Sequence, residues 1–153
     1  MPEMRIGAVD VYPLRRGADG WEVLLVRRAE GVRCAGAWEI VSGRIESDER
    51  PPDAAVRELR EEAGLEVERL YNVTVQSFYL HATDTVMVSV VFAAFVRDGV
   101  LALGHEHTEG QWVPVDHAPA RMSWPRSRAV LGDILALLGG GDAGPMEDVL
   151  RVR

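Results

Sequence analysis

The stretch "GRIESDERPPDAAVRELREEAGL", Gly43 to Leu65, joins an acidic composition to the sequence signals of a helix. Pro51 predicts the first turn, because a proline at the first helical position loses no bonded N–H. Gly64 predicts the end, because glycine readily adopts the left-handed conformation that closes many helices. With about 100° between successive residues, Glu58, Glu61 and Glu62 fall within an arc of about 100°. The stretch therefore predicts a helix with three carboxylates on one face of its last turns.

This crowding of carboxylates opposes the stability of the isolated helix. Like charges at such spacings cost a few tenths of a kcal/mol each, and acidic groups in a last turn oppose the helix dipole by roughly 0.3–1 kcal/mol. A solvated acidic face relieved by Arg57 and Arg60 is one interpretation, but one arginine cannot neutralise three convergent carboxylates. The other is a divalent cation, because Mg²⁺ and Mn²⁺ prefer hard oxygen ligands. A calcium loop is disfavoured, since "ESDE" (Glu46 to Glu49) lacks the ligand spacing of such loops.

Composition limits the cellular setting and the class of partner. The chain has 153 residues, 47% hydrophobic and 27% charged, which fits one domain with a substantial core. The formal net charge of −7 offers no long-range attraction for nucleic acid or for an anionic membrane surface. Cys34 is the single cysteine, so no internal disulfide can form. Without a signal-peptide pattern or an apolar run of about 18 residues, we expect a cytoplasmic protein.

The order of predicted elements indicates the α/β class, with a mixed β-sheet flanked by helices. Asp19-Gly20 is typical of a hairpin turn between the first two strands, and a proline precedes the second helix. We expect one domain over residues 1–140 and a C-terminal tail, mobile or docked, over residues 141–153. Strands are predicted at Arg5–Leu14, Trp21–Arg28, Trp38–Val41, Val67–Leu80, Asp84–Val96 and Glu109–Asp116, with the fourth and fifth central in the sheet, and the second helix at Trp124–Leu138.

The acidic stretch also fits a known motif, G-x5-E-x7-R-E-U-x-E-E-x-G-U, in which U is apolar. Every specified place is filled, by Gly43, Glu49, Arg57, Glu58, Leu59, Glu61, Glu62, Gly64 and Leu65. The chain therefore resembles the Nudix hydrolase family, in the motif and, through the order of its strands and last helix, over most of its length. The resemblance implies an α/β/α sandwich and a metal-assisted attack of water on the phosphoanhydride of a nucleoside diphosphate linked to another group.

The resemblance also implies roles for residues of the motif. Glu61 and Glu62 are expected to be the main metal ligands, with Glu58 a further ligand or the catalytic group that orients them and the water. The carbonyl of Ser42 is expected to point at the same metal. Gly43, Glu49, Arg57 and Gly64 are expected to structure the loop, with Arg57 clamping it through Glu49.

Two positions depart from the commoner family pattern. Val41-Ser42-Gly43 stands where proline-glycine-glycine is usual, and Asp48 stands where a glycine is frequent. Neither change removes a carboxylate. A positive φ at Ser42 or Asp48 would, however, cost about 1 kcal/mol.

A later loop and several basic and aromatic residues complete the candidate site. "LGHEHTEGQW" (Leu103 to Trp112) offers Glu106, His107 and Glu109, with Glu106 the favoured general base and Glu109 the alternative; a loop without a catalytic role is the remaining interpretation. Its Glu-His pair before a tryptophan resembles the subgroup that acts on dATP and dihydroneopterin triphosphate. Arg27 and Arg28 are candidates for phosphate binding, and Trp124 is a candidate for stacking on a base or pterin ring.

Together these features predict a magnesium-dependent pyrophosphohydrolase, with manganese able to substitute. The expected substrate is a nucleoside or pterin triphosphate, cleaved to monophosphate and pyrophosphate. An ADP-ribose or dinucleotide polyphosphate hydrolase is the alternative, and a non-catalytic nucleotide-sensing module is a third. We expect no nucleic-acid or membrane partner, and a homodimer is possible.

Overall fold

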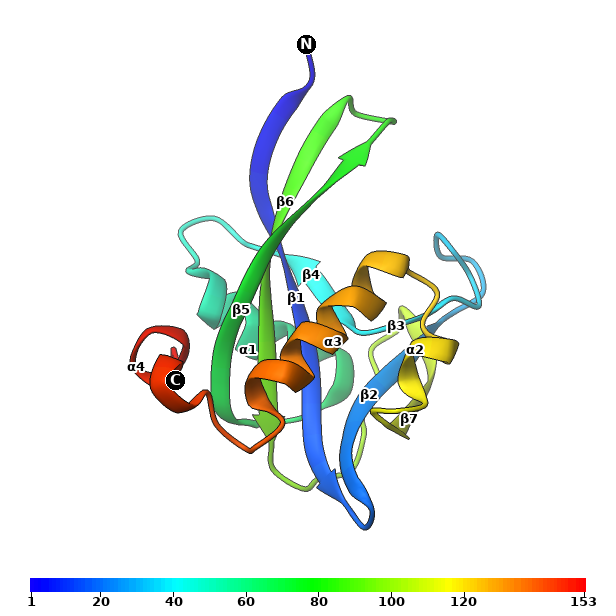
Figure 1. Ribbon diagram of the computed structural model, residues 1–153. Helices are drawn as coiled ribbons and strands as arrows, with labels where there is room; N and C mark the ends of the chain where they lie inside the picture. Colours follow the sequence, from blue (N-terminus) through cyan, green and yellow to red (C-terminus); the bar gives the residue numbers. More distant parts are fainter.

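A computed structural model describes residues 1–153 and contains one seven-stranded mixed sheet (Figure 1). The path of neighbouring strands is β3-β2-β1-β6-β5, with β4 paired to β1 and β7 paired to β2. The strands are β1 (Glu3–Gly17), β2 (Gly20–Arg28), β3 (Trp38–Glu39), β4 (Val41–Arg44), β5 (Val67–Leu80), β6 (Thr85–Val96) and β7 (His107–Pro114).

Strand β1 lies at the centre of the sheet. It runs parallel to β6 and antiparallel to β2 and β4. The prediction that the β5–β6 hairpin is central is wrong for β5, which forms an edge beside β6. The predicted turn is also displaced by one residue: Gly20 already pairs with Gly17, so Ala18 and Asp19 form the turn. The cause is the long β1, whose pairing with β2 continues to the last residue of β1 and the first residue of β2.

Helices cover both faces of the sheet, as Figure 1 shows for α1 (Pro51–Ala63) behind it and α3 (Pro125–Leu138) in front. Successive side chains of a strand point to opposite faces, and β1 divides its apolar residues accordingly. Val9 and Val11 join the core under α1, whereas Tyr12 and Leu14 join the core under α3. The predicted α/β/α arrangement is confirmed. No helix combines the length and apolar character needed to cross a membrane.

Both ends of α1 are where the sequence predicts them. Arg50 precedes the helix in an extended conformation, and Pro51 and Pro52 occupy its first turn. Gly64 has φ 69° and donates its N–H to the Arg60 carbonyl over 3.0 Å, while Leu65 N–H donates to the Leu59 carbonyl over 3.5 Å, which closes the helix. The small buried residues Ala54 and Ala55 face the sheet. Because these side chains are small, α1 packs closely on the sheet, and its carboxylate face lies against β4.

The last residues dock on the body of the protein. After the helices α2 (Ala118–Arg121) and α3, a short 3-10 turn, η1 (Gly144–Met146), leads into α4 (Glu147–Leu150). The N–H of Leu70 in β5 donates to the carbonyl of Arg153 over 3.0 Å, and Val152 N–H donates to the Leu70 carbonyl over 2.8 Å. Tyr71 donates its hydroxyl to Glu147 over 2.8 Å. These contacts hold the last residues against β5.

Candidate active site

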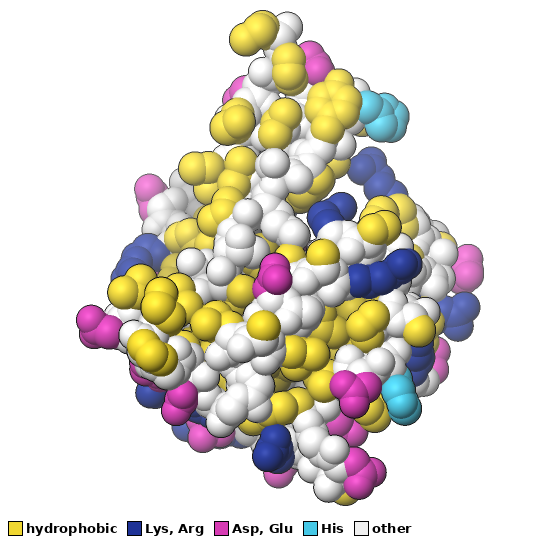
Figure 2. Space-filling model, viewed as in Figure 1, with side chains coloured by type: hydrophobic (Ala, Val, Ile, Leu, Met, Phe, Trp, Pro, Cys, Tyr) yellow, Lys and Arg dark blue, Asp and Glu magenta, His cyan; other side chains and the backbone are white.

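A cleft of about 830 Å³ opens beside β4, between α1, the loop before β7, and the ends of β5, β6 and α3. Figure 2 shows a hollow at the base of the projecting end of the sheet, with arginine side chains at its rim. The cleft gathers most of the predicted site residues: Arg28, Ser42, Gly43, Arg57, Glu58, Glu61, Glu62, Glu106 and Trp124.

Arg57 connects the loop before α1 to the carboxylates of the helix. Its Nε and Nη2 donate to the two oxygens of Glu49 over 2.8 and 2.9 Å, and Nη2 also donates to the Arg44 carbonyl over 2.9 Å. Its Nη1 donates to Glu58 over 2.9 Å and to Glu61 over 3.1 Å. The hydrogen bonds from Arg57 lower the pKa of Glu49 to about 2. The expected contact between Arg57 and Glu49 is therefore present. It holds the loop in place while Glu49 is ionised.

Glu58 is buried against the backbone of Gly43. Only 8% of Glu58 is exposed, and burial raises the pKa of its carboxyl group although the bond from Arg57 acts in the opposite direction. A Cβ atom on Gly43 would stand 1.9 Å from the Glu58 carboxyl carbon. Gly43 lies in a strand and has no positive φ, so the absence of a side chain is what this position requires.

Glu62 contacts His107, a residue of the predicted loop 103–112 whose spacing did not indicate a metal ligand. His107 Nδ1 lies 3.2 Å from Glu62 Oε2, and its side chain is 2% exposed. Burial lowers the pKa of His107, which favours the neutral ring with Nδ1–H donating to Glu62. Burial also raises the pKa of Glu62, and the charge of Glu106 adds to this effect. Its position beside Glu106 in the sequence was the only available signal for His107.

The donor set fits an oxygen-preferring cation, although the carboxylates do not yet surround one point. No group of three His, Cys, Asp or Glu side chains is placed to hold a metal ion, because Arg57 holds Glu58 and Glu61 while His107 holds Glu62. The Glu61 side chain is 55% exposed and has Arg57 as its sole ion-pair partner, so rotation can release it. The pKa values of Glu58 and Glu62 are raised because no nearby positive charge is sufficient to offset the effect of burial on these carboxylates.

The two departures from the family pattern have different outcomes. Asp48 has φ 62°, in the left-handed region that costs a non-glycine residue about 1 kcal/mol. Ser42 lies in β4 without a positive φ, so the strain considered there is absent. The Ser42 hydroxyl donates to Asp10 over 2.9 Å. The serine thus adds a polar contact that a glycine could not make.

In each pair of candidates for phosphate binding and for proton transfer, one residue lines the cleft and the other does not. Arg28 lines the cleft and donates to Glu39 over 3.0 Å. Arg27 lies outside the cleft lining, where it pairs with Glu109 over 3.8 Å. Neighbouring residues of a strand point to opposite faces, which explains the difference. Glu106 lines the cleft and Glu109 does not, so the geometry favours Glu106 of the two candidate bases.

The α3 side of the cleft contains polar residues that the sequence did not indicate. Asp10 of β1 lines this side, and burial raises the pKa of its carboxyl group against the effect of the Ser42 hydrogen bond. The Arg126 guanidinium, from the first turn of α3, lies 4.6 Å from the centre of the Phe78 ring and 5.2 Å from that of Trp124. Trp124 is therefore in the cleft, as expected, and it is stacked with an arginine.

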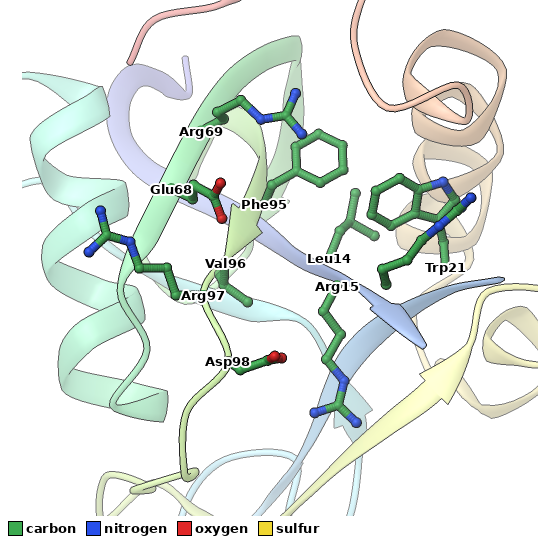
Figure 3. Close-up of a pocket in the computed structure, with 10 residues that line it drawn as sticks. Leu14, Arg15, Trp21, Glu68, Arg69, Phe95, Val96, Arg97 and Asp98 are labelled. Carbon is green, nitrogen blue, oxygen red and sulfur yellow. The ribbon is translucent and has the colours of Figure 1, made fainter. Parts of the chain in front are cut away.

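A second, smaller cavity of about 250 Å³ lies between the ends of β1, β2, β5 and β6 (Figure 3). Three of its four arginines, Arg15, Arg16 and Arg69, already have side-chain partners. Arg15 pairs with Glu22 over 2.8 Å and stacks on Trp112, while Arg69 lies 4.4 Å from the centre of the Phe95 ring. Figure 3 shows the side chains of Glu68 and Asp98 at the same cavity. We assign no site to it.

Comparison with known proteins places this geometry in a family. The family model described as "NUDIX domain" matches residues 4–133. The chain is 35% identical over 129 residues to an octanoyltransferase of Myxococcus xanthus, covering 79% of this chain and 34% of that protein. It is 33% identical over 91 residues to the oxidized purine nucleoside triphosphate hydrolase of Mus musculus, covering 60% of this chain and 58% of that protein. It thus spans about a third and about three fifths of these two relatives.

A solved structure extends the likeness to the fold. The MutT protein of Methanosarcina mazei Go1 superposes with a TM-score of 0.69 at 28% identity, covering 86% of this chain and 92% of that one.

Proposed function

Because this chain belongs to the NUDIX domain family of hydrolases, we propose that it is a magnesium-dependent pyrophosphohydrolase of nucleoside or pterin triphosphates. The observation that carries the proposal is the convergence of Glu58, Glu61, Glu62 and Glu106 on one cleft. Its volume of about 830 Å³ suits a nucleotide-sized ligand. The products are a monophosphate and pyrophosphate.

Seven residues that line the cleft have roles in this proposal. Glu58, Glu61 and Glu62, with the Ser42 carbonyl, would hold the divalent cation, for which Mn²⁺ would substitute. When bound, the cation would neutralise phosphate charge and lower the pKa of water. Glu106 accepts the proton of the attacking water, and Arg28 binds a phosphate of the substrate. Arg57, bonded to both Glu49 and Glu58, keeps the loop and the helix in register.

A substrate panel with phosphorus NMR tests the proposal. Purified protein with Mg²⁺ or Mn²⁺ is given deoxynucleoside triphosphates, dihydroneopterin triphosphate, ADP-ribose and diadenosine polyphosphates. We expect monophosphate and pyrophosphate from the triphosphates, and loss of turnover when a chelator removes the metal. Turnover of ADP-ribose or dinucleotides alone would replace this substrate class with the alternative. Nucleotide binding without any turnover would favour a sensing module.

Two substitutions test the metal ligands directly. Glu61→Gln and Glu62→Gln are each expected to lower kcat by at least about 10²-fold, the usual effect of removing a positioned catalytic group. Glu66→Gln is the matched control, because Glu66 pairs with Arg60 over 2.7 Å outside the cleft. Wild-type rates in both test variants would contradict the ligand assignment.

We also propose that the protein forms a homodimer through the projecting end of its sheet. In Figure 1 the start of β1 and the β5–β6 hairpin extend beyond the body, and Figure 2 shows apolar side chains on this end. Met4, Ile6 and Tyr79 are 71%, 72% and 57% exposed there. Sedimentation equilibrium should give twice the monomer mass, and Ile6→Asp should reduce it to one. Val100→Asp, at a residue 90% exposed elsewhere, is the control.

A further inference from the structure

Asp10 and Arg126 have opposite charges and line the same cleft, but they do not form an ion pair with each other. Asp10 accepts one side-chain hydrogen bond, from Ser42 over 2.9 Å. Arg126 has no carboxylate within 4.0 Å, although its charge acts on Asp10. A buried carboxylate normally gains a cation or several donors, because desolvation of an unpaired charge is unfavourable. The two groups therefore face a space in which a ligand can contact both.

Other groups define the shape of this space. The fully buried Ser89 hydroxyl makes no hydrogen bond within 3.5 Å, although it is near enough to Asp10 to lower the pKa of that carboxyl group. Phe78 and Trp124 line the same side of the cleft, and the Arg126 guanidinium is stacked over one face of each ring. Aromatic faces bind planar rings by stacking. The ligand part that this side of the cleft fits is a planar ring with polar atoms on one edge.

This subsite and the carboxylates of α1 lie on opposite sides of β1. Val9 pairs with Gly43 and the adjacent Asp10 pairs with Ser42, so Asp10 lies on the α3 side of β1 while Glu58 packs against Gly43 on the α1 side. Both sides belong to one cleft. A substrate with its phosphates at Glu58 can therefore place its ring at Asp10.

The charges on Asp10 and Arg126 determine which edge of a planar ring this side of the cleft can bind. A carboxylate accepts two parallel N–H bonds, and a guanidinium donates to a carbonyl oxygen. Guanine and pterin rings present a carbonyl, a ring N–H and an amino group in sequence along one edge. Adenine and cytosine present an amino group beside an acceptor nitrogen, and thymine presents one N–H between two carbonyls. We propose that Asp10 and Arg126 select a guanine or pterin ring, with Asp10 accepting the ring N–H and amino group and Arg126 donating to the carbonyl. This inference rests on the proposed triphosphate hydrolysis.

The comparison of dGTP with dITP tests it, because the two differ only in the amino group. Wild-type kcat/KM should favour dGTP by at least about 10-fold, as expected for one hydrogen bond to a charged group. Asp10→Asn should bring the ratio within about 2-fold of one, because an amide offers one acceptor and a competing donor. Asp19→Asn, in the exposed β1–β2 turn, should keep the wild-type ratio. Tryptophan fluorescence titration with GMP and IMP, without metal, should give the same order of Kd.

The outcomes separate this inference from the proposed activity. Equal kcat/KM for dGTP and dITP in the wild-type protein would overturn the inference while leaving the hydrolase intact, and this holds even if Asp10→Asn fails to fold. An equal loss for both substrates in Asp10→Asn would also overturn it, since that pattern indicates a structural role. Tighter binding of GMP than IMP without hydrolysis of any triphosphate would support the subsite and contradict the proposed activity.

Discussion

Replacing Gly43 by alanine should damage the active site far more than the fold. A Cβ at this position would lie 1.9 Å from the Glu58 carboxyl carbon and 2.2 and 2.4 Å from its oxygens. Ordinary contact begins at 3.4 Å, so the carboxyl group has to move by 3.4 − 1.9 = 1.5 Å. That movement breaks or lengthens its 2.9 Å bond from Arg57. A displacement of this size can cost about 10²-fold in rate when the displaced group positions the reaction.

The effect on stability should be small by comparison. Gly43 has no positive φ, so alanine fits the backbone and restricts the unfolded chain, which contributes about 0.4–1 kcal/mol in favour of folding. Displacing Glu58 opposes this gain by about 1–3 kcal/mol, the range for disturbing a buried polar group. We therefore expect a net loss of at most about 2.6 kcal/mol, measured by urea unfolding, beside a fall in kcat of about 10²-fold.

A second glycine provides the control for this experiment. Gly132 lies in α3, and a Cβ there meets no atom within 4 Å. Gly132→Ala should raise the free energy of unfolding by about 0.5–1 kcal/mol, the helix-propensity gain, and leave kcat unchanged. The reasoning would be refuted if Gly43→Ala kept wild-type kcat and magnesium dependence while folding normally, because Glu58 would then need no fixed position.

Three further predictions concern the loop and the tail. Arg57→Lys should lower the free energy of unfolding by about 1–3 kcal/mol in urea, because lysine cannot donate two bonds to Glu49 and one to the Arg44 carbonyl. The pKa of Glu49 lies at about 2 in the folded protein, below its ordinary 4.5, so its contribution to stability is complete above about pH 4.5 and is lost as the pH falls toward 2. The stability difference between wild type and Glu49→Gln should accordingly shrink below pH 4.5; a constant difference would contradict the pairing. Deleting residues 144–153 should lower the melting temperature, since it removes the backbone bonds to Leu70, without changing kcat.

The sequence predicted much of the acidic half of the site, because its determinants are local. Pro51 and Gly64 set the ends of α1, and the period of the helix placed Glu58, Glu61 and Glu62 on one face. The contact of Arg57 with Glu49 spans eight residues of one loop and helix, and it too was expected. The sequence could not predict that Arg57 would hold two of the carboxylates apart from a common point.

The sequence by itself thus determined the α/β class, the bounds of both long helices, and the grouping of acidic residues on α1. Only the tertiary structure decided that β1 is central, that Arg28 and not Arg27 enters the cleft, and that His107 meets Glu62. It alone brought Asp10 to the cleft that also contains Arg126, 116 positions further along the chain. The physical reason is range: helix periodicity and turn chemistry act between neighbours, whereas strand register and the seating of α3 fix which distant side chains share a face.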